Sequence, residues 1–493
     1  MNSSAFDMVL VIWKGLFANI MAEPAIFIGL IVLIGYALLR KPWYDCFSGF
    51  IKATVGFFIM QAGAGGLVNS FRPIMVGLKD RFELQAAVID PYFGFNAVNA
   101  AFAQMGWTTS LIMVALLVAF VWNIILVALH RITKIRTLFI TGHIMVQQAT
   151  TGLWLIFIGV PFMQNNIYGV VACGLLVGTY WAVFSNLTVE STQELTGNAG
   201  FAVGHQQMLG VWITDKVAGK IGNKEKSVEH LELPGFLQIF NDNVVATSTL
   251  MLFFFGAILV VLGPEYLAKN KFFNPASGEL FIKYIFKTTI QFAVYLYILS
   301  AGVRMFVAEM TESFKGISDK ILKGSLPAID CAAVYGFDAA GGNSILFGFL
   351  FGAIGQFVAV IALIAFHSPV LIIPGFVPVF FDNATLGVFA NKKGGFRGLA
   401  IICFCSGLIQ VFGGAFAAGA FGLAAYGGWH GNFDWDTLWP GIGWLIQNFG
   451  SLAIALAIIV MLIIPQLQYR RNKKGYFAAA NPDMEPELST NPA

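Results

Sequence analysis

Runs of about 20 apolar residues recur along the whole chain and limit the folds that it can adopt. A helix needs about that many apolar residues to cross the hydrocarbon core of a bilayer. Hydrophobic residues make up 57% of the 493 residues and charged residues only 11%, whereas soluble domains carry about 25% charged residues. The chain is therefore predicted to be an all-α polytopic membrane protein.

The apolar runs predict about eleven transmembrane helices within one integral membrane unit, residues 1–475. An amphipathic segment at 5–21 is expected to lie at the membrane interface before the first span. The Pro- and Ala-rich end, residues 476–493, is expected to be a disordered cytoplasmic tail. The predicted spans are 24–39, 50–70, 107–129, 138–161, 168–186, 246–265, 283–305, 341–366, 370–390, 397–421 and 441–466.

Short loops that carry lysine and arginine set the expected orientation, because such loops stay on the cytoplasmic side of a membrane. Basic residues gather after the first span, around 130–136, in the 215–232 loop, at 391–393 and at 470–474. With an odd number of spans, the N-terminus is expected in the periplasm and the C-terminus in the cytoplasm of a bacterial inner membrane. The net charge of only +3 and the scatter of the basic residues argue against a nucleic-acid partner.

One motif occurs twice, in residues 62–96 and 301–338. Each copy has an Ala-Gly pair, an amphipathic stretch with charges and an apolar segment holding a lone aspartate, Asp90 or Asp330. The span predicted before the first copy runs outward and its counterpart runs inward, as in transporters built from inverted repeats. Chance similarity between two apolar stretches is the alternative. The duplication predicts repeat one at about 24–214, repeat two at about 246–421 and a final helix at about 441–466.

Residues 190–214 are too polar to face lipid and carry too little charge for a solvated loop. Irregular backbone at membrane depth is tolerated only where protein buries it or where it lines a wet cavity. A re-entrant hairpin is therefore predicted at 190–214, and the segment 327–336 is interpreted in the same way.

Polar side chains at membrane depth are costly and mark candidate sites. His143 and Gln147 are four residues apart, so they project from one helix face. Amide, imidazole, carboxylate and phenol groups together suit a small polyhydroxylated ligand. The candidate substrate residues are Tyr92, His143, Gln147, His205, Gln206 and Asp330, with Asp382 and Asn383 in a further broken span.

Each of these groups also has a structural interpretation. His143 and Gln147 could join helices by hydrogen bonds, and His205 with Gln206 could satisfy the backbone of the hairpin. Asp330 could be a helix N-cap that never meets a ligand. For Asp90 the cap is the leading interpretation, because Asp-Pro favours a turn. The roles of Asp382 and Asn383 stay open.

Several motifs that would indicate another function class are missing. The sequence has no G-x-x-x-x-G-K-[ST] loop, G-x-S-x-G elbow or H-E-x-x-H helix, which argues against ATP binding of that type and against an intramembrane hydrolase. The five cysteines lack metal-ligand or disulfide spacing. No cofactor and no metal are expected, and the energy for transport must come from a partner protein or an ion gradient.

Longer motifs resemble a known family. The segments TGHIMVQQA, GFAVGHQQ, AIDCAAVY and IIPGFVPVFFDNATLGVFAN look like the membrane permease, or IIC component, of the bacterial L-ascorbate phosphotransferase system. The resemblance covers roughly residues 10–465. One departure is Pro91, which stands where a hydroxyl side chain is expected.

The resemblance implies a homodimer whose protomers each have two inverted five-helix repeats, re-entrant hairpins and a final helix. It implies that ascorbate binds between the hairpins of a core domain that moves as a rigid body. It further implies that a separate phosphocysteine protein, IIB, supplied by IIA, phosphorylates the bound ascorbate to L-ascorbate 6-phosphate. The family's substrate residues correspond by motif to Tyr92, His143, Gln147, His205, Gln206 and Asp330.

Asp330 is also a possible catalytic base. An apolar hairpin around it would let its carboxyl change protonation near neutral pH and take the proton of the hydroxyl that receives phosphate. The alternative function is an ion-coupled secondary transporter of a related sugar acid, with Asp330 as the proton site.

Overall fold

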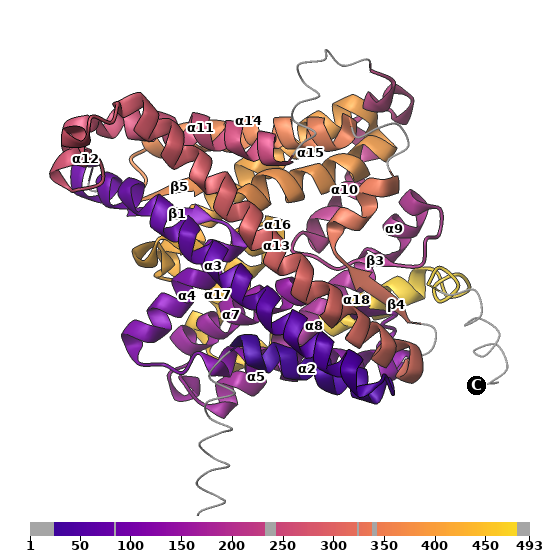
Figure 1. Cartoon of the computed structure of the whole chain (residues 1–493). Coiled ribbons are helices and arrows are strands. Elements are labelled where there is room, and N and C mark those ends of the chain that lie inside the picture. The colour runs from indigo at the N-terminus through magenta and orange to yellow at the C-terminus, as the bar shows by residue number, and fades with distance from the viewer. Residues whose placement is uncertain (1–23, 83–84, 232–242, 323–324, 338–342, 481–493) are drawn as a thin grey trace, which may run out of the picture.

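The computed structural model describes residues 24–82, 85–231, 243–322, 325–337 and 343–480, and most of them are helical (Figure 1). The segment 5–21, predicted to lie at the membrane interface, is outside the described residues. Within the described part, six helices are long and apolar enough to cross a membrane. These are Trp43–Gly63, Ser110–Ala128, Ile167–Leu187, Asn343–Ala365, Val377–Ala420 and Ser451–Arg471.

Two long helices, α3 (Trp43–Phe82) and α13 (Phe281–Ile321), lie side by side across the molecule (Figure 1). The helices α2 (Pro24–Leu38) and α11 (Asn243–Leu262) pack against this pair. At the crossing of α3 and α13 the two backbones touch through Gly56 and Gly302. A Cβ atom on Gly302 would lie 2.3 Å from the backbone nitrogen of Met60. Small residues allow this close approach of two helices.

The remaining helices surround the segments that carry the polar residues. The helix α5 packs on α8 and α7, while α14 and α10 pack on α15. Their bounds are α4 (Pro91–Met105), α5 (Ser110–Ala128), α6 (His130–Thr133), α7 (Gly142–Gly159), α8 (Ile167–Leu187), α9 (Val189–Thr196), α10 (Met208–Ile221), α12 (Pro264–Lys269), α14 (Asn343–Ala365), α15 (Asn383–Ala420), α16 (Phe433–Asp436), α17 (Leu438–Phe449) and α18 (Ser451–Arg471).

The fold is mostly helical, as predicted, and it also contains short strands that the sequence analysis did not anticipate. Two three-stranded parallel sheets have the strand orders β5-β1-β6 and β2-β4-β3. Each strand is only two to five residues long, and its partners lie far away in the sequence, so periodicity alone could not reveal it. The strands are β1 (Gln85–Ile89), β2 (Thr137–Phe139), β3 (Ala202–Val203), β4 (Leu326–Ile329), β5 (Val370–Pro374) and β6 (Gly428–Trp429).

The two sheets exchange strands between the halves of the chain. β1 comes from the first half and pairs with β5 and β6 from the second, whereas β4 comes from the second half and pairs with β2 and β3 from the first. Both central strands follow a long helix, α3 or α13, and both are followed directly by an aspartate, Asp90 or Asp330. The registers also correspond, since Val88 pairs with Gly428 and Ala328 pairs with Ala202.

Two predicted spans have a different structure. Residues 370–390 begin with the strand β5, continue through a π-helical turn at Val377–Asp382 and enter α15 only at Asn383. Pro374 ends β5, which is an edge strand and so tolerates a residue without an N–H. The span predicted at 441–466 is divided into α17 and α18 at Gly450, whose φ of 59° interrupts the helix.

The first residues of the predicted disordered tail, 476–480, are packed against the protein. Tyr476 and Phe477 are buried, and the Tyr476 ring lies 3.6 Å from the guanidinium carbon of Arg136. The Tyr476 hydroxyl donates to the carbonyl of Lys134 and accepts from the amide of Asn186. These contacts hold the segment up to residue 480 against the protein, and residues 481–493 lie outside the described part.

The α3–α13 crossing leads to a first prediction. We expect Gly56→Ala to destabilise the protein by about 1–3 kcal/mol, because overpacking of this size forces backbones apart. A Cβ atom on Gly56 would lie 2.7 Å from the backbone nitrogen of Phe306. Gly65→Ala is the matched control on the same helix, since no atom lies within 4 Å of its added Cβ. Thermal unfolding in detergent measures both, and equal melting temperatures would contradict the tight crossing.

Candidate functional site

Three chain segments bring His143, His205 and Asp330 together. Asp330 directly follows β4, His205 follows β3 after one residue, and His143 stands near the start of α7, shortly after β2. Because β2, β4 and β3 are parallel neighbours, their carboxyl ends lie at one edge of the sheet. Gly204 makes the approach possible, since a Cβ atom there would lie 2.7 Å from the backbone of Ala328.

The three side chains form a compact polar cluster. Nε2 of His143 lies 3.5 Å from Oδ2 of Asp330, and the two imidazole rings are 6.3 Å apart at 65°. One ligand atom from each of the three residues lies within 4.8 Å of the others. The histidines are buried, whereas 38% of the Asp330 side chain is exposed, so a ligand can reach the cluster from the side of the carboxylate.

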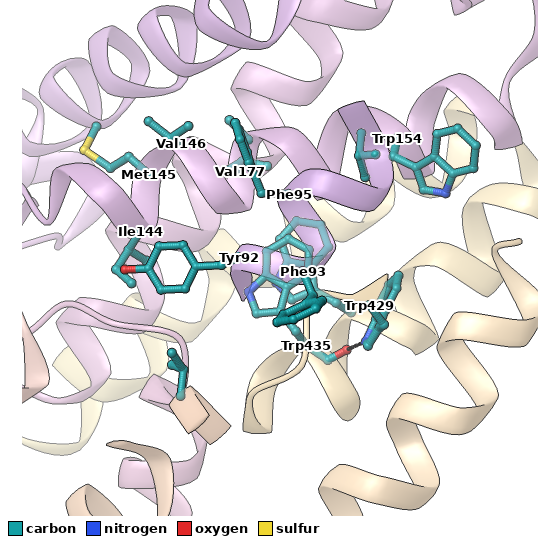
Figure 2. Close-up of a cluster of buried hydrophobic side chains, with 14 of the residues drawn as sticks. Tyr92, Phe93, Phe95, Ile144, Met145, Val146, Trp154, Val177, Trp429 and Trp435 are labelled. Atoms are coloured by element: carbon teal, nitrogen blue, oxygen red, sulfur yellow. Dashed lines mark hydrogen bonds between the residues drawn. The ribbon is translucent and has the colours of Figure 1, made fainter. Parts of the chain in front are cut away.

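Two glutamines and a tyrosine continue the cluster. Nε2 of Gln206 donates to Oε1 of Gln147 over 2.7 Å, which joins the turn after β3 to α7. The phenol of Tyr92 is buried near the amide of Gln147. Figure 2 shows Tyr92 directed toward Ile144, away from the tryptophans against which its neighbour Phe93 packs. The α4 segment therefore contributes Tyr92 to the polar side and Phe93 to the apolar core.

The two histidines are held differently. Nδ1 of His205 lies 2.6 Å from Oε1 of Gln207, which also accepts the backbone N–H of Gln206. Since an amide oxygen can only accept, Nδ1 of His205 carries the hydrogen and Nε2 offers a lone pair. Nδ1 of His143 is buried without a hydrogen-bond partner among the described residues. A buried polar atom of this kind calls for a ligand or an ordered water.

Two kinds of ligand fit this donor set. Two imidazoles and a carboxylate at this spacing could hold a divalent cation. The neighbouring amides and phenol, however, are neutral groups that pair with hydroxyl and carbonyl oxygens rather than with cations. The complete set, with both glutamines and Tyr92, therefore favours a small polyhydroxylated molecule.

Asp90 occupies the corresponding place in the other sheet, but both of its carboxylate oxygens already have hydrogen-bond partners within the protein. Its two carboxylate oxygens accept the backbone N–H groups of Tyr92 and Val377, over 3.0 and 3.1 Å. Val377 and His143 occupy corresponding positions. Val377 lies four residues beyond Ile373, which pairs with Val88. His143 lies four residues beyond Phe139, which pairs with Ala328. The same register thus gives a capped carboxylate in one sheet and a carboxylate facing histidines in the other.

Comparisons with known proteins agree with this architecture. Residues 19–436 match the family model for the sugar-specific permease component of the PTS system, EIIC-GAT. The chain belongs to this permease family. It is also 34% identical over 435 residues to a Mycoplasma pneumoniae protein named ascorbate-specific PTS system EIIC component. That alignment covers 81% of this chain but only 65% of the relative.

Membership of the permease family confirms the resemblance drawn from the motifs. The structure also shows how the alternatives for individual residues combine. One oxygen of Asp330 caps the backbone N–H of Ala332, and the other faces His143, so cap and site coexist. Gln147 likewise joins two elements while it borders the cluster. The side chain of His205 bonds Gln207 rather than the hairpin backbone.

Two imidazoles lie near the carboxylate of Asp330, so its surroundings are more polar than the apolar hairpin expected from the sequence. Asp90 is the N-cap of α4, as predicted. Asp382 is buried and accepts from Asn432, Gln410 and the N–H of Phe433, so it anchors the turn after β6.

Two residues around the cluster were missed from the sequence, His430 and Thr151, which lie behind Gln206. Gln207, the last residue of the polar GHQQ segment, orients His205. His430 lies in the glycine-rich segment GGWHGN, where a polar residue between apolar stretches could have indicated a further irregular turn.

The contrast between the two aspartates gives a second prediction. We expect Asp90→Asn to destabilise the protein by about 1–3 kcal/mol, because the new amide would place a donor against the buried N–H of Val377. Asp330→Asn is the matched control. It keeps an oxygen for Ala332 and turns its amide toward Nε2 of His143, which a neutral imidazole can offer as an acceptor, so its melting temperature should fall less than that of Asp90→Asn. A fully stable Asp90→Asn variant would show that the cap is dispensable.

Proposed function

We propose that this permease takes up L-ascorbate as the IIC component of a phosphotransferase system. A separate IIB protein, recharged by IIA, phosphorylates the substrate to L-ascorbate 6-phosphate. The observation that carries the proposal is the cluster of His143, His205 and Asp330 bordered by two amides and a phenol. The name of the Mycoplasma pneumoniae relative supports the choice of substrate.

The cluster matches the chemistry of ascorbate. The molecule has an acidic enediol ring and a side chain with two hydroxyls, so it needs both donors and acceptors. Asp330 and the free Nε2 of His205 accept hydroxyl hydrogens, while the Gln147 amide can donate to a ring oxygen. The N-terminus of α7 begins at Gly142, beside His143, and adds partial positive charge for an anionic ring.

The proposed transport mechanism uses two inverted five-helix repeats, about 24–214 and 246–421, followed by a final helix, for about eleven spans in all. The exchange of strands between the two halves supports this arrangement. Rigid-body movement of the core that carries the sheets, relative to the α3–α13 pair, would present the site to each side in turn. Two copies would form a homodimer in the bacterial inner membrane among its lipids, with the N-terminus periplasmic and the C-terminus cytoplasmic.

In this scheme the permease carries no phosphoryl group and is not itself an enzyme. Asp330 holds the hydroxyl that receives phosphate and takes its proton as the phosphocysteine of IIB approaches. Its partial exposure leaves the carboxylate accessible, and the facing histidines support a polar path for the proton.

Uptake into membrane vesicles tests the function. We expect accumulation of ascorbate phosphate only when a phosphorylatable IIB protein and its phosphate donors are present, because the permease has no other energy source in this scheme. Accumulation of unmodified ascorbate driven by a proton or sodium gradient would instead establish a secondary transporter.

The same vesicles test the site. His205→Ala should weaken ascorbate binding about 5- to 150-fold, the cost of an unmade buried polar contact. Gln164→Ala is the control, since this glutamine is exposed and lies away from the sheets. Normal affinity in His205→Ala would remove the histidine from the site.

The role of Asp330 gives a further prediction. Asp330→Asn keeps the size and most hydrogen bonds of the side chain but cannot act as a base. We expect it to bind ascorbate and to lose most IIB-dependent phosphorylation. Binding by calorimetry and product formation by phosphate transfer measure the two activities separately. Equal loss of both would make Asp330 a binding residue only.

A further inference from the structure

We propose that His430 is a positioning residue that orients Gln206 and, through it, the Gln147 amide toward the substrate. This inference rests on the proposed function, because Gln147 borders the proposed substrate cluster. His430 is fully buried behind Gln206 and directly follows β6, which belongs to the other sheet from the strands that carry the cluster. It therefore acts on the site from outside it.

A series of hydrogen bonds begins at α7, passes through the turn after β6 and the turn after β3, and returns to α7. The hydroxyl of Thr151 lies 2.8 Å from Nδ1 of His430, and Nε2 of His430 bonds Oε1 of Gln206. Nε2 of Gln206 then donates to Oε1 of Gln147 over 2.7 Å. Thr151, His430 and Gln206 are each 0% exposed, so these side chains bond to one another and not to bulk water.

In this series of hydrogen bonds, the donor and acceptor of one bond determine the donor and acceptor of the next. With the oxygen of Gln147 facing Gln206, the Gln206 amide must turn its nitrogen to Gln147 and its oxygen to His430. His430 must then carry its hydrogen on Nε2 and accept the Thr151 hydroxyl on Nδ1. Consequently the nitrogen of Gln147 is turned away from Gln206, which leaves it available as a donor to the substrate.

The imidazole of His430 is held rigidly enough for this role. Its ring stacks on Trp435 with centroids 4.0 Å apart, and Trp435 stacks on Trp439 at 4.2 Å. The backbone of His430 packs closely on Gly94, because a Cβ atom at Gly94 would lie only 2.6 Å from Cα of His430. Stacking and close packing fix the ring plane, so the position of Nε2 is set before any ligand binds.

The turn after β6 and the turn after β3 differ in where each places its histidine. Trp429 pairs with Ile89 as Val203 pairs with Ile329, so His430 in one turn corresponds to Gly204 in the other. At the next position the residues are reversed, with Gly431 opposite His205. Each turn thus contributes one histidine, and His205 lies in the cluster while His430 supports the amide beside it.

Four variants test the role. His430→Leu removes the donor to Gln206 and should raise the KM for ascorbate uptake about 5- to 150-fold while changing kcat little. His430→Gln, which can place an N–H near the same point, should recover most of the affinity. Thr151→Val, remote from the substrate, should raise KM about 2- to 12-fold, the range for one net hydrogen bond, and Thr151→Ser should restore it.

The outcomes separate positioning from packing. Melting temperatures of the ligand-free variants report packing, and the increase in melting temperature on adding ascorbate reports the site. Wild-type KM in both His430→Leu and Thr151→Val would overturn the role of His430. Loss of folded protein in Thr151→Val with no change in KM for the folded fraction would do the same. Absence of ascorbate binding by the wild type would overturn the proposed function itself.

Discussion

Backbone hydrogen bonds between the two halves of the chain are the interaction on which the rest of the structure depends. Each central strand, β1 or β4, is paired only with strands of the opposite half. Extended backbone among apolar helices must satisfy its N–H and C=O groups within the protein, and strand exchange does this. The same pairing aligns the carboxyl ends of three strands, so it creates the place where the polar side chains meet.

The two sheets show how one architecture yields both a structural and a functional position. Asp90 is 3% exposed and both of its oxygens are used by backbone N–H groups. Asp330 uses one oxygen in the same way and presents the other to His143. At corresponding positions, four residues beyond Ile373 and Phe139, Val377 faces Asp90 with its backbone N–H and His143 faces Asp330 with its imidazole.

The buried polar groups of this protein differ in how many of their polar atoms have hydrogen-bond partners. Asp434 accepts from the N–H groups of Leu209 and Gly210 and from the hydroxyl of Tyr180, so its role is to hold the start of α10. Arg136, which the sequence suggested as a loop cation, is buried and donates to Asn186, Glu190 and the Tyr476 carbonyl. Nδ1 of His143 has no hydrogen-bond partner among the described residues. What distinguishes the candidate site is that this unsatisfied nitrogen lies on a residue that also faces a partly exposed carboxylate, that of Asp330.

The sequence by itself determined the class of protein, most of the long helices and the identity of the cluster residues, because apolar length and polar residues at membrane depth are local properties. The motif shared by the two copies also identified Asp90 and Asp330 as corresponding residues. Only the tertiary structure decided that residues 370–374 form a strand, that Asp90 is closed while Asp330 is open, and that His430 supports Gln206. Each of these depends on a partner more than 200 residues away in the sequence. Pairings over such distances leave no periodic signal in either segment, so they are decided where the two halves meet.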